Sequence, residues 1–154
     1  MIARLRFVFV LLVLSTSCGS NKNQLSGSVS DSYPLDFKKV TAALDGSVLV
    51  VEYWKGTVET DGFTIKLVVD LSGLTVKSGQ SIDLTEQVNG GPRGNIQQIR
   101  EQTVDLAFDK GTLSFSAVPS AGATVTGHFN ATFTDPPGRA MQGDFDALLA
   151  KAAQ

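Results

Sequence analysis

The pattern of hydrophobic and polar positions begins with a short apolar run near the start of the chain. Eight consecutive apolar residues, 7–14, follow Arg4 and Arg6 and precede three small residues, 15–17. A basic start, a short apolar run and a small-residue stretch are the three parts of a secretory signal. The run is also shorter than the about 20 residues that a membrane-spanning helix needs. We therefore predict a signal peptide over residues 1–17.

A long region of strict alternation follows later in the chain. Apart from Gly127 and Gly143, hydrophobic side chains occupy every second position in residues 63–69, 104–108, 113–117, 125–133 and 141–149. A period of two is typical of half-buried strands with one face on a core. Turn signals at residues 109–111 and 135–138 predict hairpins, and further loops are expected at 72–73, 78–79 and 89–94. The pattern predicts an all-β domain of about eight or nine strands, either an antiparallel sandwich or a small barrel.

The polar stretch between these two regions has a composition of its own. Residues 18–31 are rich in Ser, Gly and Asn and carry little apolar area that a core would bury. This composition is typical of a flexible linker. We expect a tether over residues 18–31 and a single domain over residues 32–154, a length that suits one hydrophobic core.

The predicted strand at residues 48–54 differs because both of its faces are apolar. One face carries Val48, Val50 and Trp54, and the other carries Leu49, Val51 and Tyr53. Such a strand is covered on both faces, either by the chain's own loops or by a ligand or partner. We take Val48, Val50, Tyr53 and Trp54 as a candidate partner surface. Arg93, in the glycine-rich loop 90–94, is a further candidate recognition residue.

The charge balance excludes one class of partner. The chain has 13 basic and 15 acidic side chains, and Arg4 and Arg6 belong to the predicted signal. The rest is mildly acidic, and its lysines and arginines are scattered along the chain. Recognition of nucleic acid needs a basic patch, so we exclude nucleic acid as a partner.

Few residues bring reactive chemistry. His128 is the single histidine and Cys18 the single cysteine, so they cannot supply the three or four ligands of a zinc site. The neighbours of His128 on the same face of its strand are Thr126, Asn130 and Thr132, and none is a serine or cysteine nucleophile. We expect no catalytic residue, no metal ion and no cofactor.

Asp144 and Asp146 share one face of the last predicted strand, about 7 Å apart. Two carboxylates at that separation are compatible with an inverting hydrolase or a calcium ion. Polar alternation on an exposed face explains them more simply, because calcium takes more oxygen ligands than two carboxylates offer. A hydrolase at this face is a third hypothesis.

Cys18 ends the small-residue stretch Ser15-Thr-Ser. This position resembles the lipobox of bacterial lipoproteins, although the family usually has leucine where this chain has Ser15, and Leu14 lies one residue further back. The resemblance implies acylation at Cys18 and anchoring to a membrane. Gly19 in place of aspartate implies the outer membrane, facing the periplasm or the cell surface. An ordinary signal peptide with an incidental cysteine is the alternative.

The end of the chain resembles the C-terminal hairpin of small uncharacterised lipoproteins of Gram-negative bacteria. Residues 127–133 read Gly-x-Phe-x-Ala-x-Phe, and residues 143–147 read Gly-x-Phe-x-Ala. The resemblance covers roughly a fifth of the chain and implies an all-β envelope lipoprotein without implying an activity.

We therefore predict a non-enzymatic binding or interaction module, anchored to the cell envelope by lipid and directed at an envelope protein partner. The alternative is a carrier of a small hydrophobic ligand inside the barrel or sandwich. The strand at residues 48–54 separates the two hypotheses. An outward-facing strip favours a protein partner, and a strip that lines a cavity favours an apolar ligand.

Overall fold

The structure, a computed structural model, describes residues 23–58, 62–99, 103–135 and 137–151. Within these residues it contains strands and one short 3-10 turn. They are β1 (Gln24–Ser26), η1 (Ser28–Asp31), β2 (Lys39–Asp45), β3 (Val48–Trp54), β4 (Phe63–Asp70), β5 (Ser81–Asp83), β6 (Gln87–Val88), β7 (Gly91–Pro92), β8 (Gly94–Ile99), β9 (Thr103–Leu106), β10 (Phe108–Phe115), β11 (Thr124–Phe133) and β12 (Ala140–Lys151). The prediction of an all-β domain is confirmed.

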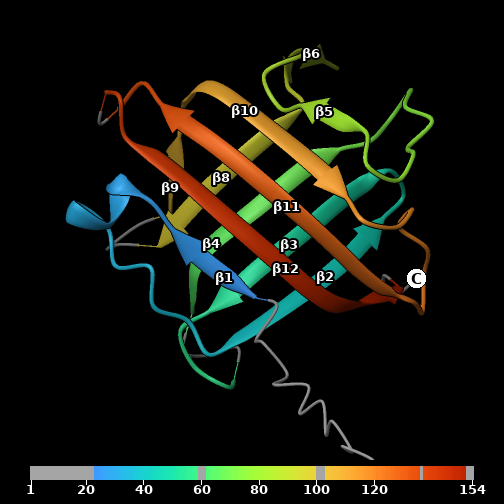
Figure 1. The fold of residues 1–154 in the computed structure, drawn as a ribbon, viewed down its shortest axis with the longest axis horizontal. Helices are drawn as coiled ribbons and strands as arrows, with labels where there is room; N and C mark the ends of the chain where they lie inside the picture. The colour runs from blue at the N-terminus through green and yellow to red at the C-terminus, as the bar shows by residue number, and fades with distance from the viewer. Residues whose placement is uncertain (1–22, 59–61, 100–102, 136, 152–154) are drawn as a thin grey trace, which may run out of the picture.

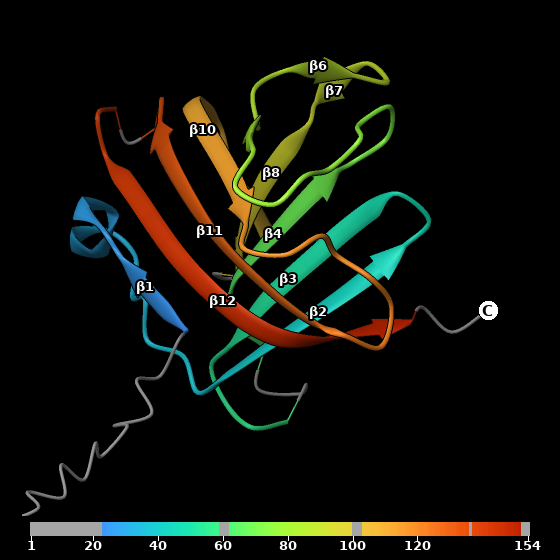
Figure 2. The ribbon, with the colours of Figure 1, turned by 45° about the vertical axis from the view of Figure 1, so that its right-hand side comes forward.

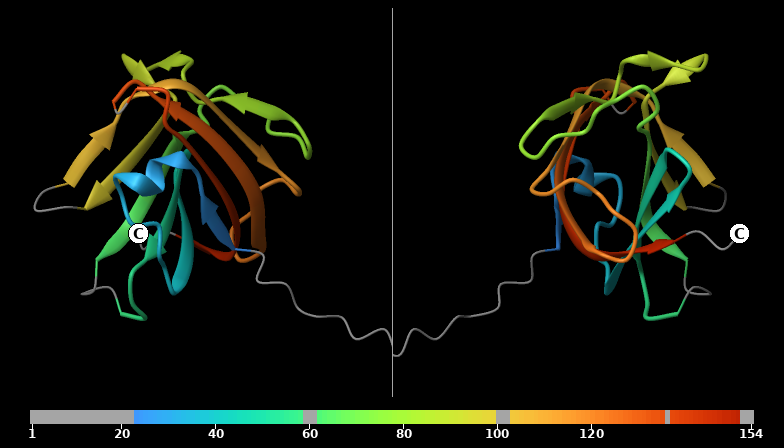
Figure 3. Two further views of the ribbon diagram at one scale, coloured as in Figure 1. Left: turned by 60° about the vertical axis from the view of Figure 1, so that its left-hand side comes forward. Right: turned by 90° about the vertical axis from the view of Figure 1, so that its right-hand side faces the viewer.

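One curled sheet makes up most of the molecule, in the order β5-β10-β11-β12-β2-β3-β4-β8-β9, with β1 beside β12. Strands β10, β11 and β12 cross in front of β2, β3, β4 and β8 (Figure 1), so the sheet forms two layers around an interior. The same curl is visible from the side in Figures 2 and 3. The hairpin β6–β7 forms a separate two-stranded ribbon.

Strand β12 belongs to both layers. Residues 140–148 pair with β11, and residues 149–151 pair with β2. The β12–β2 pair is parallel, whereas the other strand pairs of the described chain are antiparallel, so the predicted antiparallel arrangement is wrong for this one contact. No hairpin joins these two strands, and only a hairpin forces neighbouring strands to run in opposite directions.

The two layers of the curled sheet are joined at Ala107. Strand β9 pairs with β8, and β10, which begins one residue later, pairs with β11. The carbonyl of Ala107 accepts a hydrogen bond from the backbone N–H of Thr134 at 3.0 Å. One bent segment of chain therefore takes part in both layers.

The interior is filled by large side chains from the inner faces of both layers. The largest that are fully buried are Tyr53, Phe115, Phe129, Phe133, Phe145, Leu49, Ile65, Leu67, Leu84, Ile96, Leu113 and Met141. The aromatic rings contact one another edge to face, as in the pairs Tyr53–Phe129 and Phe115–Phe145. Each buried aromatic or aliphatic side chain contributes about 1.5–3 kcal/mol through the hydrophobic effect.

The glycines of the C-terminal hairpin make room for phenylalanine rings. Gly127 lies opposite Phe145, and Gly143 lies opposite Phe129. A methyl group added at Gly127 would overlap the ring of Phe145, and one added at Gly143 would overlap the ring of Phe129. The repeated Gly-x-Phe pattern is therefore a reciprocal pair of contacts in which each ring covers the glycine of the other strand.

The predicted inward position of Phe63 and the predicted hairpin at residues 109–111 are both wrong, each for a local reason. Phe63 lies on the outer face, because a bulge between β3 and β4 sets it opposite Trp54, with Thr64 left unpaired between Phe63 and Ile65. The predicted hairpin at residues 109–111 is absent, and Gly111 lies inside β10. Its missing side chain admits Leu84, whose Cβ would lie 3.0 Å from a Cβ at that position.

The predicted tether is wrong over residues 24–31, while residues 18–22 lie outside the described residues. Strand β1 pairs with residues 142–144 of β12, and Val29 in η1 is fully buried. The side-chain amide of Asn23 also exchanges hydrogen bonds with the backbone of Asp146. Backbone pairing and one buried valine thus outweigh the polar composition on which the prediction depended.

Candidate functional site

The structure divides the predicted partner surface on β3 between the two faces of the sheet. Val48, Val50 and Trp54 lie on the outer face and are half-buried. Tyr53 lies on the inner face with no exposed surface. Its hydroxyl donates to the backbone oxygen of Asp144 at 2.8 Å. Tyr53 is therefore a core residue that joins the two layers and not part of an outer surface.

Burial changes the acid–base chemistry of Tyr53. Its hydroxyl is removed from water, and the charge of Asp144 lies nearby. Burial first, and the Asp144 charge second, raise the pKa of Tyr53 well above its ordinary range. The hydroxyl therefore remains a hydrogen-bond donor throughout the neutral and mildly alkaline range.

The outer side of β3 is a packed strip that continues onto neighbouring strands. The indole Nε1 of Trp54 donates to Thr41 Oγ1 at 2.8 Å, and its ring meets that of Phe63 edge to face at 6.4 Å. Glu52 and Lys66 form an ion pair across the strip at 2.9 Å. The strip faces outward and does not line a cavity. Of the two hypotheses for this strand, an outward-facing strip favours a protein partner over an apolar ligand.

Arg93 lies at the bend between β7 and β8, but its side chain is buried, which argues against the predicted recognition role. Its side chain is only 4% exposed. The guanidinium Nη1 donates to the backbone oxygens of Asp70 at 2.6 Å and Ser72 at 3.2 Å, and Nε pairs with Glu86 at 3.0 Å. Its donors are directed at two neighbouring loops, so Arg93 holds those loops together.

The predicted anchor at Cys18 lies outside the described residues. In the part of the chain that is described, no helix has the length and hydropathy needed to cross a bilayer.

The outer face of β11 and β12 carries a hydrogen-bond network around His128 that the alternation of hydrophobic and polar residues did not predict. Nδ1 of His128 lies 2.7 Å from a carboxylate oxygen of Asp144, and the amide nitrogen of Asn130 lies 2.9 Å from Nε2. A carboxylate only accepts and an amide NH₂ only donates, so the His128 proton is on Nδ1 and Nε2 accepts from Asn130. Asp144 thereby fixes the imidazole, and the imidazole fixes the amide of Asn130.

This network contains the residue types of a nucleophilic triad without its geometry. Ser114 lies opposite His128 on the neighbouring strand, a cross-strand relation that inspection of single strands misses. However, Nε2 of His128 is engaged by Asn130 and not by Ser114. The backbone near Ser114 pairs with β5 and β11, and Ser116 N–H donates to Thr126, so these amides are not available as an oxyanion hole.

Asp144 and Asp146 do not form a carboxylate pair around a cleft. Asp144 is engaged by His128, and the backbone of Asp146 is engaged by Asn23. Neither residue lines a principal hollow of the described chain. Among the described residues there is also no cluster of three or more potential metal ligands.

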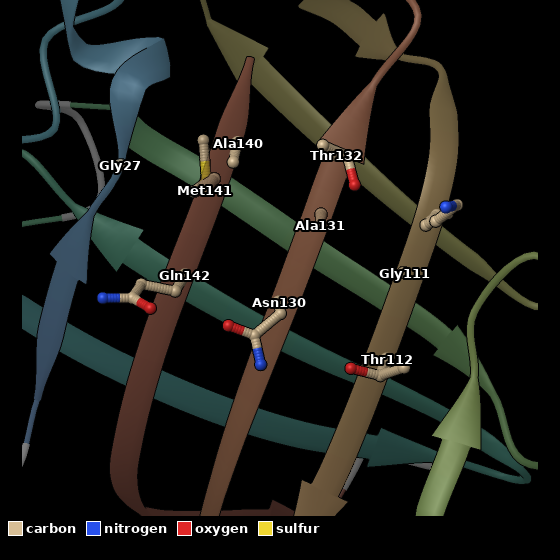
Figure 4. A pocket seen from close by; sticks show the side chains of 10 residues that line it. Gly27, Gly111, Thr112, Asn130, Ala131, Thr132, Ala140, Met141 and Gln142 are labelled. Carbon is tan, nitrogen blue, oxygen red and sulfur yellow. The ribbon is translucent and has the colours of Figure 1, made fainter. Parts of the chain in front are cut away.

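A groove crosses the strands beside this network and is here called the cross-strand groove. Two rows of outward side chains flank it, Lys110–Thr132–Ala140 and Thr112–Asn130–Gln142, each running across β10, β11 and β12 (Figure 4). Its floor is the backbone of Gly111, Ala131 and Met141, and its volume is about 370 Å³. Gly27 closes it at the β12 side.

The groove continues beyond β10 into a second hollow over β5. This hollow, of about 320 Å³, shares Lys110, Gly111 and Thr112 with the first and adds Ser81, Asp83 and Thr85. The two together form one trough that crosses four strands.

Comparison with known proteins leaves the site to be interpreted from its own geometry. No protein-family model, no curated protein and no solved structure matches this chain.

A third hollow lies on another part of the surface, beside the bend at Ala107. Its lining includes Asn95, Asp105 and Phe108, and its volume is about 460 Å³. The large core side chains line none of these three hollows, apart from Met141 in the first and Leu106 in the third. These hollows of the described chain therefore lie outside the packed interior.

Proposed function

We propose that this protein is a non-enzymatic binding or interaction module of the cell envelope, attached to a membrane by lipid at Cys18. The observation that carries the proposal is the contrast between a filled interior and hollowed outer faces. Aromatic side chains occupy the space between the layers, whereas the groove over β10–β12 is open to solvent. A ligand or partner would therefore be met on the outside of the sheet.

The same contrast weighs against the carrier of a small hydrophobic ligand. Such a carrier needs an apolar cavity that encloses most of the ligand. Tyr53, Phe129 and Phe145 are fully buried in the interior, where a carried ligand would lie. Displacing rings of this kind costs several kcal/mol, so the interaction module is the better-supported function.

A hydrolase is supported less well. His128 has its two ring nitrogens engaged by Asp144 and Asn130, so neither is available to activate a nucleophile in this arrangement. The contacts instead hold side chains in place beside a groove, which is what a binding site requires.

The lipid anchor is tested by Cys18→Ala in the full chain expressed in a Gram-negative host. We expect the unaltered chain in the membrane fraction with the mass of a triacylated cysteine. The variant should lose that mass and appear in the soluble fraction. Retention of the Cys18→Ala chain in the membrane fraction would contradict the anchor.

Native mass spectrometry of the detergent-extracted full chain tests the binding mode. We expect the mass of the lipidated protein alone after detergent removal. An additional mass that is lost on organic extraction would instead establish an internal apolar ligand and favour the carrier.

A further inference from the structure

We propose that the cross-strand groove is a binding site for a neutral oligosaccharide. The structure assigns this ligand class through the balance of hydrogen-bonding groups, the shape of the groove and the way its amides are held. The inference rests on the proposed binding function and names the ligand class for one of its surfaces.

The groove has the dimensions of a short sugar chain. The two flanking rows are two residues apart along each strand, which is about 7 Å. The trough from β12 to β5 spans three strand spacings, or about 14 Å. A space of this width and length admits a chain of two or three pyranose rings and is open to solvent along its top.

Its lining offers hydrogen-bond donors and acceptors together and carries one charged side chain, Lys110. Thr112 and Thr132 carry hydroxyls, and Asn130 and Gln142 carry amides, all of which both donate and accept. Lys110 shares the second hollow with Asp83, so the lining of the trough as a whole has no net formal charge. Sugar hydroxyls also donate and accept, so this lining fits them. A phosphate or a polyanion would instead need several cations.

The two amides are held in place before any ligand arrives. Asn130 donates to His128, which Asp144 orients, and this leaves the Asn130 oxygen directed away from the imidazole. Gln142 donates through Nε2 to Ser26 Oγ at 3.0 Å, which likewise leaves its oxygen unengaged by that contact. Side chains that are already ordered lose less entropy on binding, so the network raises affinity without touching the ligand.

The floor of the groove argues against an extended peptide as the ligand. Peptides commonly bind by adding a strand to an unpaired sheet edge. Gly111, Ala131 and Met141 lie opposite one another in the β10–β11–β12 ladders, so their backbone groups face neighbouring strands. Ala131 and Met141 turn their side chains to the core and Gly111 has none, so the floor presents backbone to a ligand.

The test is calorimetric titration of the detergent-extracted full chain with chitotetraose and with maltotetraose, in a detergent that has no sugar headgroup. We expect one of these neutral tetrasaccharides to bind and a tetragalacturonate of equal length not to bind. The double variant Thr112→Val with Thr132→Val removes two hydroxyls and keeps the shape of both side chains. It should weaken binding about tenfold or more.

Thr124→Val is the matched control, because Thr124 is exposed on β11, the strand of Thr132, and lies outside the groove. It should bind as the unaltered chain does. A second variant, His128→Phe, removes the support of Asn130 without removing a lining residue and should weaken binding several-fold. The proposal is overturned if neither neutral sugar binds, if the polyanion binds better, or if the double variant and the control bind equally. These outcomes are independent of the fractionation of Cys18→Ala, so failure of the sugar site and failure of the anchor are distinguishable.

Discussion

At the scale of single residues, the glycines of the C-terminal hairpin are structural components of the core. Gly143 and Gly127 have no side chain because the rings of Phe129 and Phe145 occupy that space. The Gly-x-Phe motif of this hairpin is therefore explained by packing. It carries no information about a ligand.

This packing predicts the cost of a single methyl group. Gly143→Ala places a Cβ against the ring of Phe129 and should lower the free energy of unfolding by about 1–3 kcal/mol, measured by urea denaturation. Gly91→Ala is the control, because nothing lies within 4 Å of a Cβ added there, and it should change stability by less than about 0.5 kcal/mol. Equal effects at the two positions would contradict the ring-over-glycine contact.

Tyr53 predicts how stability depends on alkaline pH. Its pKa is raised in the folded state, first by burial and then by Asp144, so the folded protein retains the phenolic proton that the unfolded chain loses above about pH 10. The contribution of the protonated Tyr53 to the free energy of unfolding is fully present below pH 10. As the pH rises further, the free energy of unfolding falls by up to about 1.4 kcal/mol per pH unit. Denaturation curves between pH 9 and 12 measure this loss.

The matched variant is Tyr53→Phe, which keeps the ring and removes the ionisable group. It should be less stable at neutral pH by about 1 kcal/mol, because the Asp144 carbonyl loses its donor. Its stability should fall less steeply above pH 10 than that of the unaltered protein. Parallel curves for the two proteins would show that Tyr53 does not cause the pH dependence.

At the scale of elements, the N-terminal segment β1–η1 is part of the fold although its composition predicts a tether. Val29 is buried, and Ser28 Oγ accepts from the backbone N–H of Ala140 at 3.0 Å. Arg139 donates to the carbonyl of Ser28 and also pairs with Asp31. These contacts attach the segment to the start of β12.

Val29→Ala tests this attachment. We expect the free energy of unfolding to fall by about 1–3 kcal/mol, because a fully buried branched side chain is truncated. The control Ser30→Ala changes an exposed neighbour and should have almost no effect. If Val29→Ala is as stable as the unaltered protein in thermal unfolding, the segment contributes nothing to the fold.

Alternation along the sequence predicted most strands because a half-buried strand must repeat every two residues. It identified the hairpin at residues 135–138, which joins β11 to β12. It did not predict the bulge at Trp54 or the passage of Leu84 over Gly111, because both depend on contacts between distant segments. The His128 network was missed for the same reason, since Asp144 and Ser114 come from neighbouring strands.

At the scale of the whole molecule, the sheet closes around its core through contacts made by the chain's own loops. Leu84 donates its N–H to Gly111 of β10 and accepts from Gly94 of β8, each at 2.8–2.9 Å. Its side chain lies against both glycines. Leu84 therefore connects the layer of β10–β12 to the layer that contains β8, and Tyr53 connects β3 to β12 through its hydroxyl.

The ordering of the chain from Asn23 onward limits the reach of an anchor at Cys18. The stretch from Cys18 to Asn23 covers at most about 18 Å even when fully extended. A linker through residue 31 would have allowed more than twice that distance. With the proposed lipid at Cys18, a domain held so closely would meet molecules of its own bilayer at a high effective concentration, and its search for them would be confined to a thin layer. Affinity too weak to matter in free solution would then be sufficient for residence at the membrane surface.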